Sequence, residues 1–95
     1  MPAHLVVIYI TLAIPHAQSL KDKRQAVKSL KDRLRARLNA SVAEIAFQDE
    51  WQRAGIAVAM ISNDKKKLQQ DIAIIQQLVD VARDITVLAV KQEWL

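Results

Sequence analysis

Basic side chains are concentrated in one short segment of this 95-residue chain, and their chemistry suits a polyanion. Eight of the fourteen lysines and arginines fall within seventeen positions, opposed there only by Asp22 and Asp32. They are Lys21, Lys23, Arg24, Lys28, Lys31, Arg33, Arg35 and Arg37. An array of one sign binds phosphates because it releases the counterions condensed on a nucleic acid. The segment predicts RNA binding, with a solvated helix face or an acidic protein partner as alternatives.

Helical spacing gathers some of these cations on one side. At about 100° per residue, Arg24, Lys28, Lys31 and Arg35 fall within a sector of about 60° that flanks the apolar stripe. Lys21 and Lys23 stand at the start of the same helix. The candidate RNA- or anion-binding residues are therefore Lys21, Lys23, Arg24, Lys28, Lys31 and Arg35. On a merely solvated face, Asp32 would pair with Lys28 or Arg35.

A second cluster of cations, Lys65, Lys66 and Lys67, begins the second helix directly after Asp64. Free backbone N–H groups at a helix N-terminus, with cations nearby, form an anion site. The cluster is a candidate secondary anion site, and the alternative is that these lysines only keep the surface soluble.

A polar turn carries two adjacent carboxylates, Asp49 and Glu50, next to Trp51. Paired carboxylates can perform acid–base chemistry, but catalysis also needs an enclosing site and a perturbed pKa, which this turn does not indicate. A tryptophan at a hairpin tip packs over a sheet edge or enters an interface. We expect Trp51 to pack on its own sheet.

Other site chemistries are disfavoured. The two histidines, His4 and His16, lie at opposite ends of one predicted strand, too far apart to share a metal ion. Gly55 is the single glycine, which excludes glycine-rich nucleotide-binding loops, and the chain has no cysteine. We therefore expect no metal, no cofactor and no enzymatic activity.

The elements that position these residues alternate between strand and helix. We predict strands at 5–13, 41–47, 54–62 and 85–90, with helices from 19 to 38 and from the Asn63 or Asp64 cap onward. Ser19 with Asp22 should cap the first helix, and Asn39 should close it in the left-handed conformation. The order β-α-β-β-α-β indicates an α+β, ferredoxin-like domain over residues 1–95, whose antiparallel four-stranded sheet carries both helices on one face.

The sheet face opposite the helices is predicted to be apolar. It would present Leu5, Val7, Tyr9, Ala57 and Ala59, a surface that favours a homodimer interface. The flank of the second helix, with Ile74, Leu78 and Val81, would support a further contact. The two central strands offer only Tyr9 as an aromatic, which excludes RNA recognition by base stacking on the sheet.

Composition bounds the remaining possibilities. The longest apolar run without a charge, 5–15, is too short to span a membrane, and no basic segment precedes it as in a signal peptide. With no cysteine, the chain suits a reducing compartment. We expect a cytoplasmic protein without membrane attachment.

Four short motifs are distinctive: Ser-Leu-Lys-Asp-Lys-Arg at 19–24, Arg-Leu-Arg at 33–35, Asn-Ala-Ser-Val-Ala-Glu at 39–44 and Trp-Gln-Arg-Ala at 51–54. With these motifs the chain resembles the YlxP family. The chain departs from the family at Leu38, where an aromatic residue is expected, and at Ala40, which replaces a larger aliphatic. The resemblance implies a small bacterial ferredoxin-like protein, often encoded near translation and ribosome-maturation genes. It implies no reaction. The sequence thus favours a non-enzymatic RNA- or ribosome-associated protein, with a homo-oligomeric scaffold or regulatory interaction module as the alternative.

Overall fold

Strands and helices follow the predicted alternation along the chain. The computed structural model describes residues 2–95. The elements are β1 (His4–Ala13), α1 (Leu20–Arg37), β2 (Ala40–Ala46), β3 (Arg53–Ser62), α2 (Lys65–Asp80) and β4 (Thr86–Trp94).

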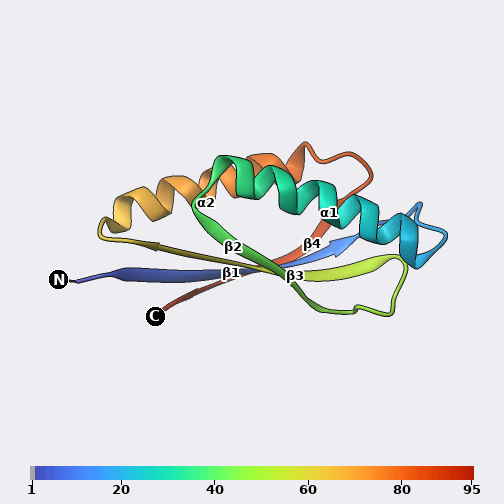
Figure 1. Ribbon diagram of the computed structural model, residues 1–95, viewed down its shortest axis with the longest axis horizontal. Coiled ribbons are helices and arrows are strands. Elements are labelled where there is room, and N and C mark those ends of the chain that lie inside the picture. The colour runs from blue at the N-terminus through green and yellow to red at the C-terminus, as the bar shows by residue number, and fades with distance from the viewer. Residues whose placement is uncertain (1) are drawn as a thin grey trace.

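The four strands form one antiparallel sheet in the order β2-β3-β1-β4. Both helices cover one face of this sheet, and nothing from the described residues covers the other (Figure 1). Right-handed crossovers in the two βαβ halves produce this arrangement. The predicted ferredoxin-like α+β fold is confirmed.

Side-chain alternation on the two central strands sets the core. Every second residue of β1 and β3 points toward the helices and is buried, while the residues between point to the uncovered face. The buried strand residues are Val6, Ile8, Ile10, Leu12, Ala54, Ile56, Val58 and Met60. Val27, Leu30 and Leu34 from α1 and Leu68, Ile72, Ile75 and Val79 from α2 complete the core. The apolar stripes predicted for both helices therefore face the sheet.

Both helix starts are capped by side chains. The Ser19 hydroxyl accepts from the Asp22 backbone N–H at 3.0 Å, and the Asp22 carboxylate accepts from the Gln18 N–H at 3.0 Å. Asp64 accepts from the Lys66 N–H at 3.0 Å. The acidic capping box at 19–22 is confirmed, and Asp64 rather than Asn63 caps α2.

Two element ends differ from the prediction. Asn39 does not close α1 in the left-handed conformation, because the helix ends at an extended Leu38. The non-glycine residues with positive φ are instead Phe47 and Asp84 within residues 2–95. The last strand continues to Trp94 instead of ending at residue 90, since its polar residues still pair with β1.

The predicted flank of α2 is also not free. Ile74 and Leu78 pack against the core, and only Val81 is strongly exposed. These three residues therefore do not form the exposed apolar patch that the expected second contact would need.

Candidate functional site

Five of the six candidate cations on α1 lie outside the core. They are Lys21, Arg24, Lys28, Lys31 and Arg35, which we call the basic stripe. Lys28 pairs with Asp32 at 2.8 Å, and both side chains are more than half exposed. The hydrogen bond from Lys28, together with the charges of Lys28, Arg35 and Lys31, lowers the pKa of Asp32. The stripe is thus a cationic surface with one carboxylate embedded in it.

Arg35 fixes one end of the stripe to the sheet. Its guanidinium donates to the main-chain oxygen of Val42 on β2 at 2.7 Å. Because β2 is an edge strand, the stripe runs beside that edge of the sheet. The guanidinium retains other N–H donors that can reach a ligand.

Lys23 does not belong to the stripe, and its assignment as a phosphate contact is wrong. Its side chain is 0% exposed. The ammonium donates to Glu44 Oε2 at 2.9 Å and to the main-chain oxygens of Phe47 at 2.8 Å, Gln48 at 3.2 Å and Arg53 at 3.3 Å. With all its donors used inside the protein, Lys23 has none to offer a phosphate.

The spacing of Lys23 contains a signal for this burial. It precedes Val27 by four positions and Leu30 by seven, which is the spacing of the apolar stripe itself. Grouping the residue by charge concealed its place on the buried side of α1. The lysine ties the first turn of α1 to the hairpin between β2 and β3.

The β2–β3 turn is held from several directions. The Gln52 main-chain oxygen accepts from Ile14 N–H at 2.9 Å, and its side chain donates to the Ala17 oxygen at 3.1 Å. Arg53 pairs with Glu50 and lies over the Phe47 ring, 3.8 Å from its centroid. Together with the Lys23 ammonium, these contacts fix both ends of the turn.

Trp51 stands on this turn and is 53% exposed. The expectation that it packs on its own sheet is therefore wrong. Of the neighbouring carboxylates, Asp49 is exposed, and Glu50 is exposed and paired with Arg53. An anchored turn that carries an exposed indole has the character of a contact surface.

Some groups at the start of α2 already have partners within the protein. The Asp64 carboxylate accepts from the Lys66 N–H, one of the backbone N–H groups at this helix start. Lys67 pairs with Asp71 at 2.7 Å, and the Lys65 ammonium lies 5.0 Å from the centroid of the Trp94 ring. Lys66 is exposed. The secondary anion site at 65–67 stays a prediction, with Lys65 and Lys67 already in contact with Trp94 and Asp71.

The uncovered sheet face carries the five residues predicted for it. Leu5, Val7 and Tyr9 of β1 lie opposite Ile61, Ala59 and Ala57 of β3, and directly opposed residues share a face. Ser41 and Ala43 of β2 extend this surface, since they lie opposite Ala59 and Ala57. Ile61 is 55% exposed. This apolar area is what we call the open face.

Charges limit the open face toward β4. Lys91 and Glu93 lie opposite Tyr9 and Val7, and the Tyr9 hydroxyl donates to Glu93 at 3.3 Å. The charge of Glu93 is the main cause that raises the pKa of Tyr9. The apolar part of the open face therefore covers β2, β3 and β1, with a polar border at β4.

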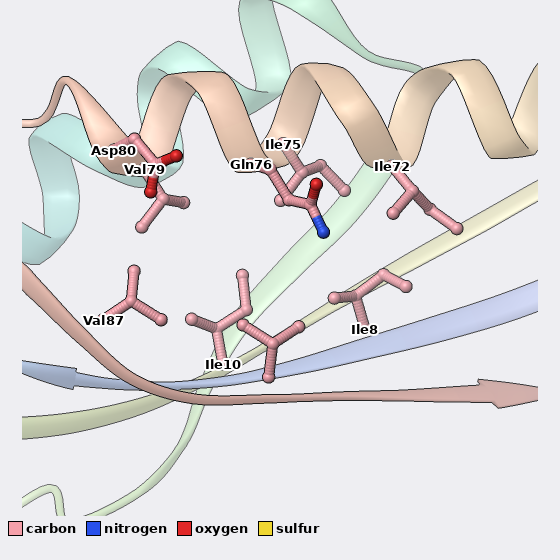
Figure 2. Close-up of a pocket in the computed structure, with 9 residues that line it drawn as sticks. Ile8, Ile10, Ile72, Ile75, Gln76, Val79, Asp80 and Val87 are labelled. Atoms are coloured by element: carbon pink, nitrogen blue, oxygen red, sulfur yellow. The ribbon is translucent and has the colours of Figure 1, made fainter.

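A groove of about 220 Å³ opens between α2 and the sheet (Figure 2). Isoleucines and valines from α2, β1 and β4 line it, with Gln76 and Asp80 as its polar residues. The groove exists because α2 covers β4 incompletely, which leaves Val90 partly exposed. No sequence signal located it, since it depends on how far apart the helix and strand settle.

A family model described as a protein of unknown function (DUF503) matches residues 5–92. The chain belongs to the DUF503 family. A curated relative, described as uncharacterized protein YlxP of Bacillus subtilis (strain 168), is 35% identical over 82 residues. That match covers 82% of this chain and 85% of the relative. The resemblance seen in the motifs is confirmed.

Solved structures similar to this DUF503 chain share its fold. A designed protein with a ferredoxin fold has a TM-score of 0.54 at 12% identity, covering 96% of this chain and 82% of that one. A dimeric ferredoxin-like protein from an uncultured marine organism has a TM-score of 0.51 at 10% identity, covering 97% and 95%. At these identities the likeness concerns architecture alone.

Within residues 2–95 of this DUF503 member, no three histidine, cysteine or acidic side chains are grouped so that they could hold a metal ion. His4 begins β1 and His16 follows its end, so the two stay apart as expected. None of the helices in the described part of the chain is both long and apolar enough to cross a bilayer. The candidate surfaces are the basic stripe, the β2–β3 turn and the open face.

Proposed function

We propose that this protein is a non-enzymatic accessory protein of the cytoplasm that binds the phosphate backbone of RNA through the basic stripe. The observation that carries the proposal is the concentration of five cations outside the core along one helix. Phosphate contacts of this kind position a nucleic acid without reading its sequence.

Two considerations favour structured RNA as the polyanion. The chain is similar to YlxP, and the family resemblance implies a gene context near translation and ribosome-maturation genes, which makes a ribosomal association the natural setting. The central strands also offer only Tyr9 among the aromatic residues that stack unpaired bases. Binding should therefore follow the backbone of a folded RNA and depend little on its sequence.

Burial of Lys23 reduces the number of phosphates that the helix can engage. Arg24, Lys28, Lys31 and Arg35 remain as the core of the stripe, with Lys21 at its end. Four engaged phosphates give a slope of roughly −3 to −4 when log affinity is plotted against log salt concentration. The ion pair of Lys28 with Asp32 is a weak obstacle, because exposed pairs contribute about 0–1 kcal/mol.

The test is a double charge reversal, Lys28→Glu with Lys31→Glu. Affinity for a fluorescently labelled RNA hairpin should fall, and the salt slope should flatten by about two units. Lys66→Glu with Arg83→Glu changes the net charge equally but lies off the stripe, so it serves as the matched control. If both double variants bind equally well at low salt, the stripe is only a solvated face.

A homodimer formed through the open face is the second candidate, as a scaffold or regulatory interaction module. Its support is the apolar area over β2, β3 and β1, which nothing in the described chain covers. Sedimentation at tens of micromolar should give twice the 10.7 kDa of one chain. Ala57→Lys, in the middle of the open face, should give monomers, while Ala73→Lys on the exposed side of α2 should not.

A further inference from the structure

The anchored β2–β3 turn extends toward the open side of the sheet. In Figure 1 the segment between β2 and β3 hangs below the level of the strands, opposite the helices. Asp49 and Trp51 are exposed there, while Glu50, Gln52 and Arg53 make contacts within the protein. A fully buried lysine, Lys23, thus anchors a turn whose one large apolar side chain, Trp51, is exposed.

A shallow hollow lies at the other end of the same two strands. It has a volume of about 250 Å³. Four of its lining residues, Leu5, Ser41, Ala59 and Ile61, belong to the open face. Asn39 also lines it and, like Ser41, offers a hydrogen-bond donor. A largely apolar lining with these donors suits an indole that follows the carboxylate of Asp49 in the chain.

Symmetry connects the turn and the hollow. Consider two copies whose open faces meet, related by a two-fold axis that lies between the sheets and is perpendicular to their strands. This axis places β3 of one copy over β3 of the other, and the two strands run in opposite directions. Each turn then meets the far end of its partner's open face, where the hollow is. We propose that Trp51 of each copy docks into this hollow of a second copy, an inference that rests on the proposed homodimer.

The area needed for a stable dimer supports this arrangement. The open face spans three strands by about five residues, which is roughly 240 Å² per copy. Two such faces bury about 500 Å², well short of the roughly 1,200 Å² at which stable interfaces begin, so a dimer through this face needs further contacts. Trp51, which is 53% exposed, is the large apolar side chain that the neighbouring turn can add.

The position of the hollow also fits self-complementarity. An isologous interface repeats each contact twice, so one turn and one hollow per chain satisfy both copies without leaving a free site. The border of Lys91 and Glu93 on β4 keeps the contact centred on β2, β3 and β1. These three strands carry both the turn and the hollow.

The first experiment measures dimerisation of the full chain and of Trp51→Ala by sedimentation over a range of concentrations. Since two indoles are lost per dimer and each is an anchor residue, the dissociation constant should rise by about 100-fold or more. In a Trp94→Phe background, Trp51 is the single tryptophan, and its quenching by acrylamide should increase as the dimer is diluted.

The second experiment uses the absence of cysteine from the chain. Asp49→Cys combined with Ser41→Cys should give a covalent dimer on treatment with a short bis-maleimide. Asp49→Cys combined with Ser29→Cys, an exposed position on α1, should remain monomeric under denaturing conditions.

The outcomes separate the two proposals. Wild-type chains that remain monomeric at all concentrations overturn the homodimer and the docking together. A dimer that Trp51→Ala leaves unchanged, with Trp51 equally quenchable in both states, overturns the docking alone and leaves the open-face dimer standing. Weakened association, protected Trp51 and cross-linking between 49 and 41 support the docking.

Discussion

Replacing Lys23 with methionine tests the most unusual contact in the core. Methionine keeps much of the buried stem but removes the ammonium, whose three N–H groups serve four acceptors. The two short bonds go to Phe47 and Glu44, and the third donor is shared between the longer contacts to Gln48 and Arg53. The substitution leaves Glu44, only 17% exposed, without its counterion.

Breaking a buried ion pair by removing one partner costs about 3–5 kcal/mol. A 95-residue domain is stable by roughly 5–14 kcal/mol, so the change should remove between about a fifth and all of the free energy of unfolding. With an m-value of about 1.5 kcal/mol/M, the urea midpoint should fall by roughly 2–3 M. Urea unfolding followed by far-UV circular dichroism measures this shift.

Lys21→Met is the matched control, because it makes the same substitution on an exposed position of the same helix. It should change stability by about 0.5 kcal/mol or less. A loss below about 1 kcal/mol for Lys23→Met would refute the idea that the ammonium stabilises the hairpin. Lys23→Met with Glu44→Leu should recover part of the loss, since the unpaired carboxylate is then gone.

Three further outcomes are expected. Gly55→Ala should destabilise the domain by about 1–3 kcal/mol in thermal melts, because a Cβ at Gly55 would lie 2.8 Å from the Cβ of Ala46. An unchanged melting temperature would contradict this close approach. The pKa of Tyr9 should lie above about 10 by ultraviolet titration and should fall toward that value in Glu93→Gln. A pKa raised on folding favours the neutral phenol, so this contribution to stability is present below about pH 10 and lost as the pH rises through the folded pKa. Trp51→Ala should change the free energy of unfolding of the monomer by only about 0.5 kcal/mol. A loss near 3 kcal/mol would show that the indole packs within its own chain.

The fold could be predicted from the sequence because local signals agree with the packing. Alternation on β1 and β3, the Ser19 cap and the heptad-like spacing in both helices each indicate the face that is buried in the structure. The end of β4 could not be predicted, because its polar residues lie on an edge strand where partial exposure removes the apolar signal.

The candidate site was harder to predict for two physical reasons. A charged side chain is expected to be exposed, yet Lys23 is buried. Its ammonium is stabilised by three carbonyl groups and a carboxylate of the β2–β3 hairpin, all from residues more than twenty positions away in the sequence. The exposure of Trp51 depends on the path of a turn, and turn residues carry no periodic signal. The open face was predicted correctly because alternation alone decides it.

The contact between Arg35 and Val42 also bears on how copies of the chain avoid uncontrolled aggregation. An edge strand exposes unpaired backbone groups on which another strand can add. At β2 the guanidinium occupies one of these carbonyl groups, the strand is seven residues long, and its pairing with β3 is irregular between Glu44 and Ala46. Each feature shortens or distorts the straight ladder that strand addition requires. The helix side chain that contributes to the basic stripe therefore also blocks one route to fibres.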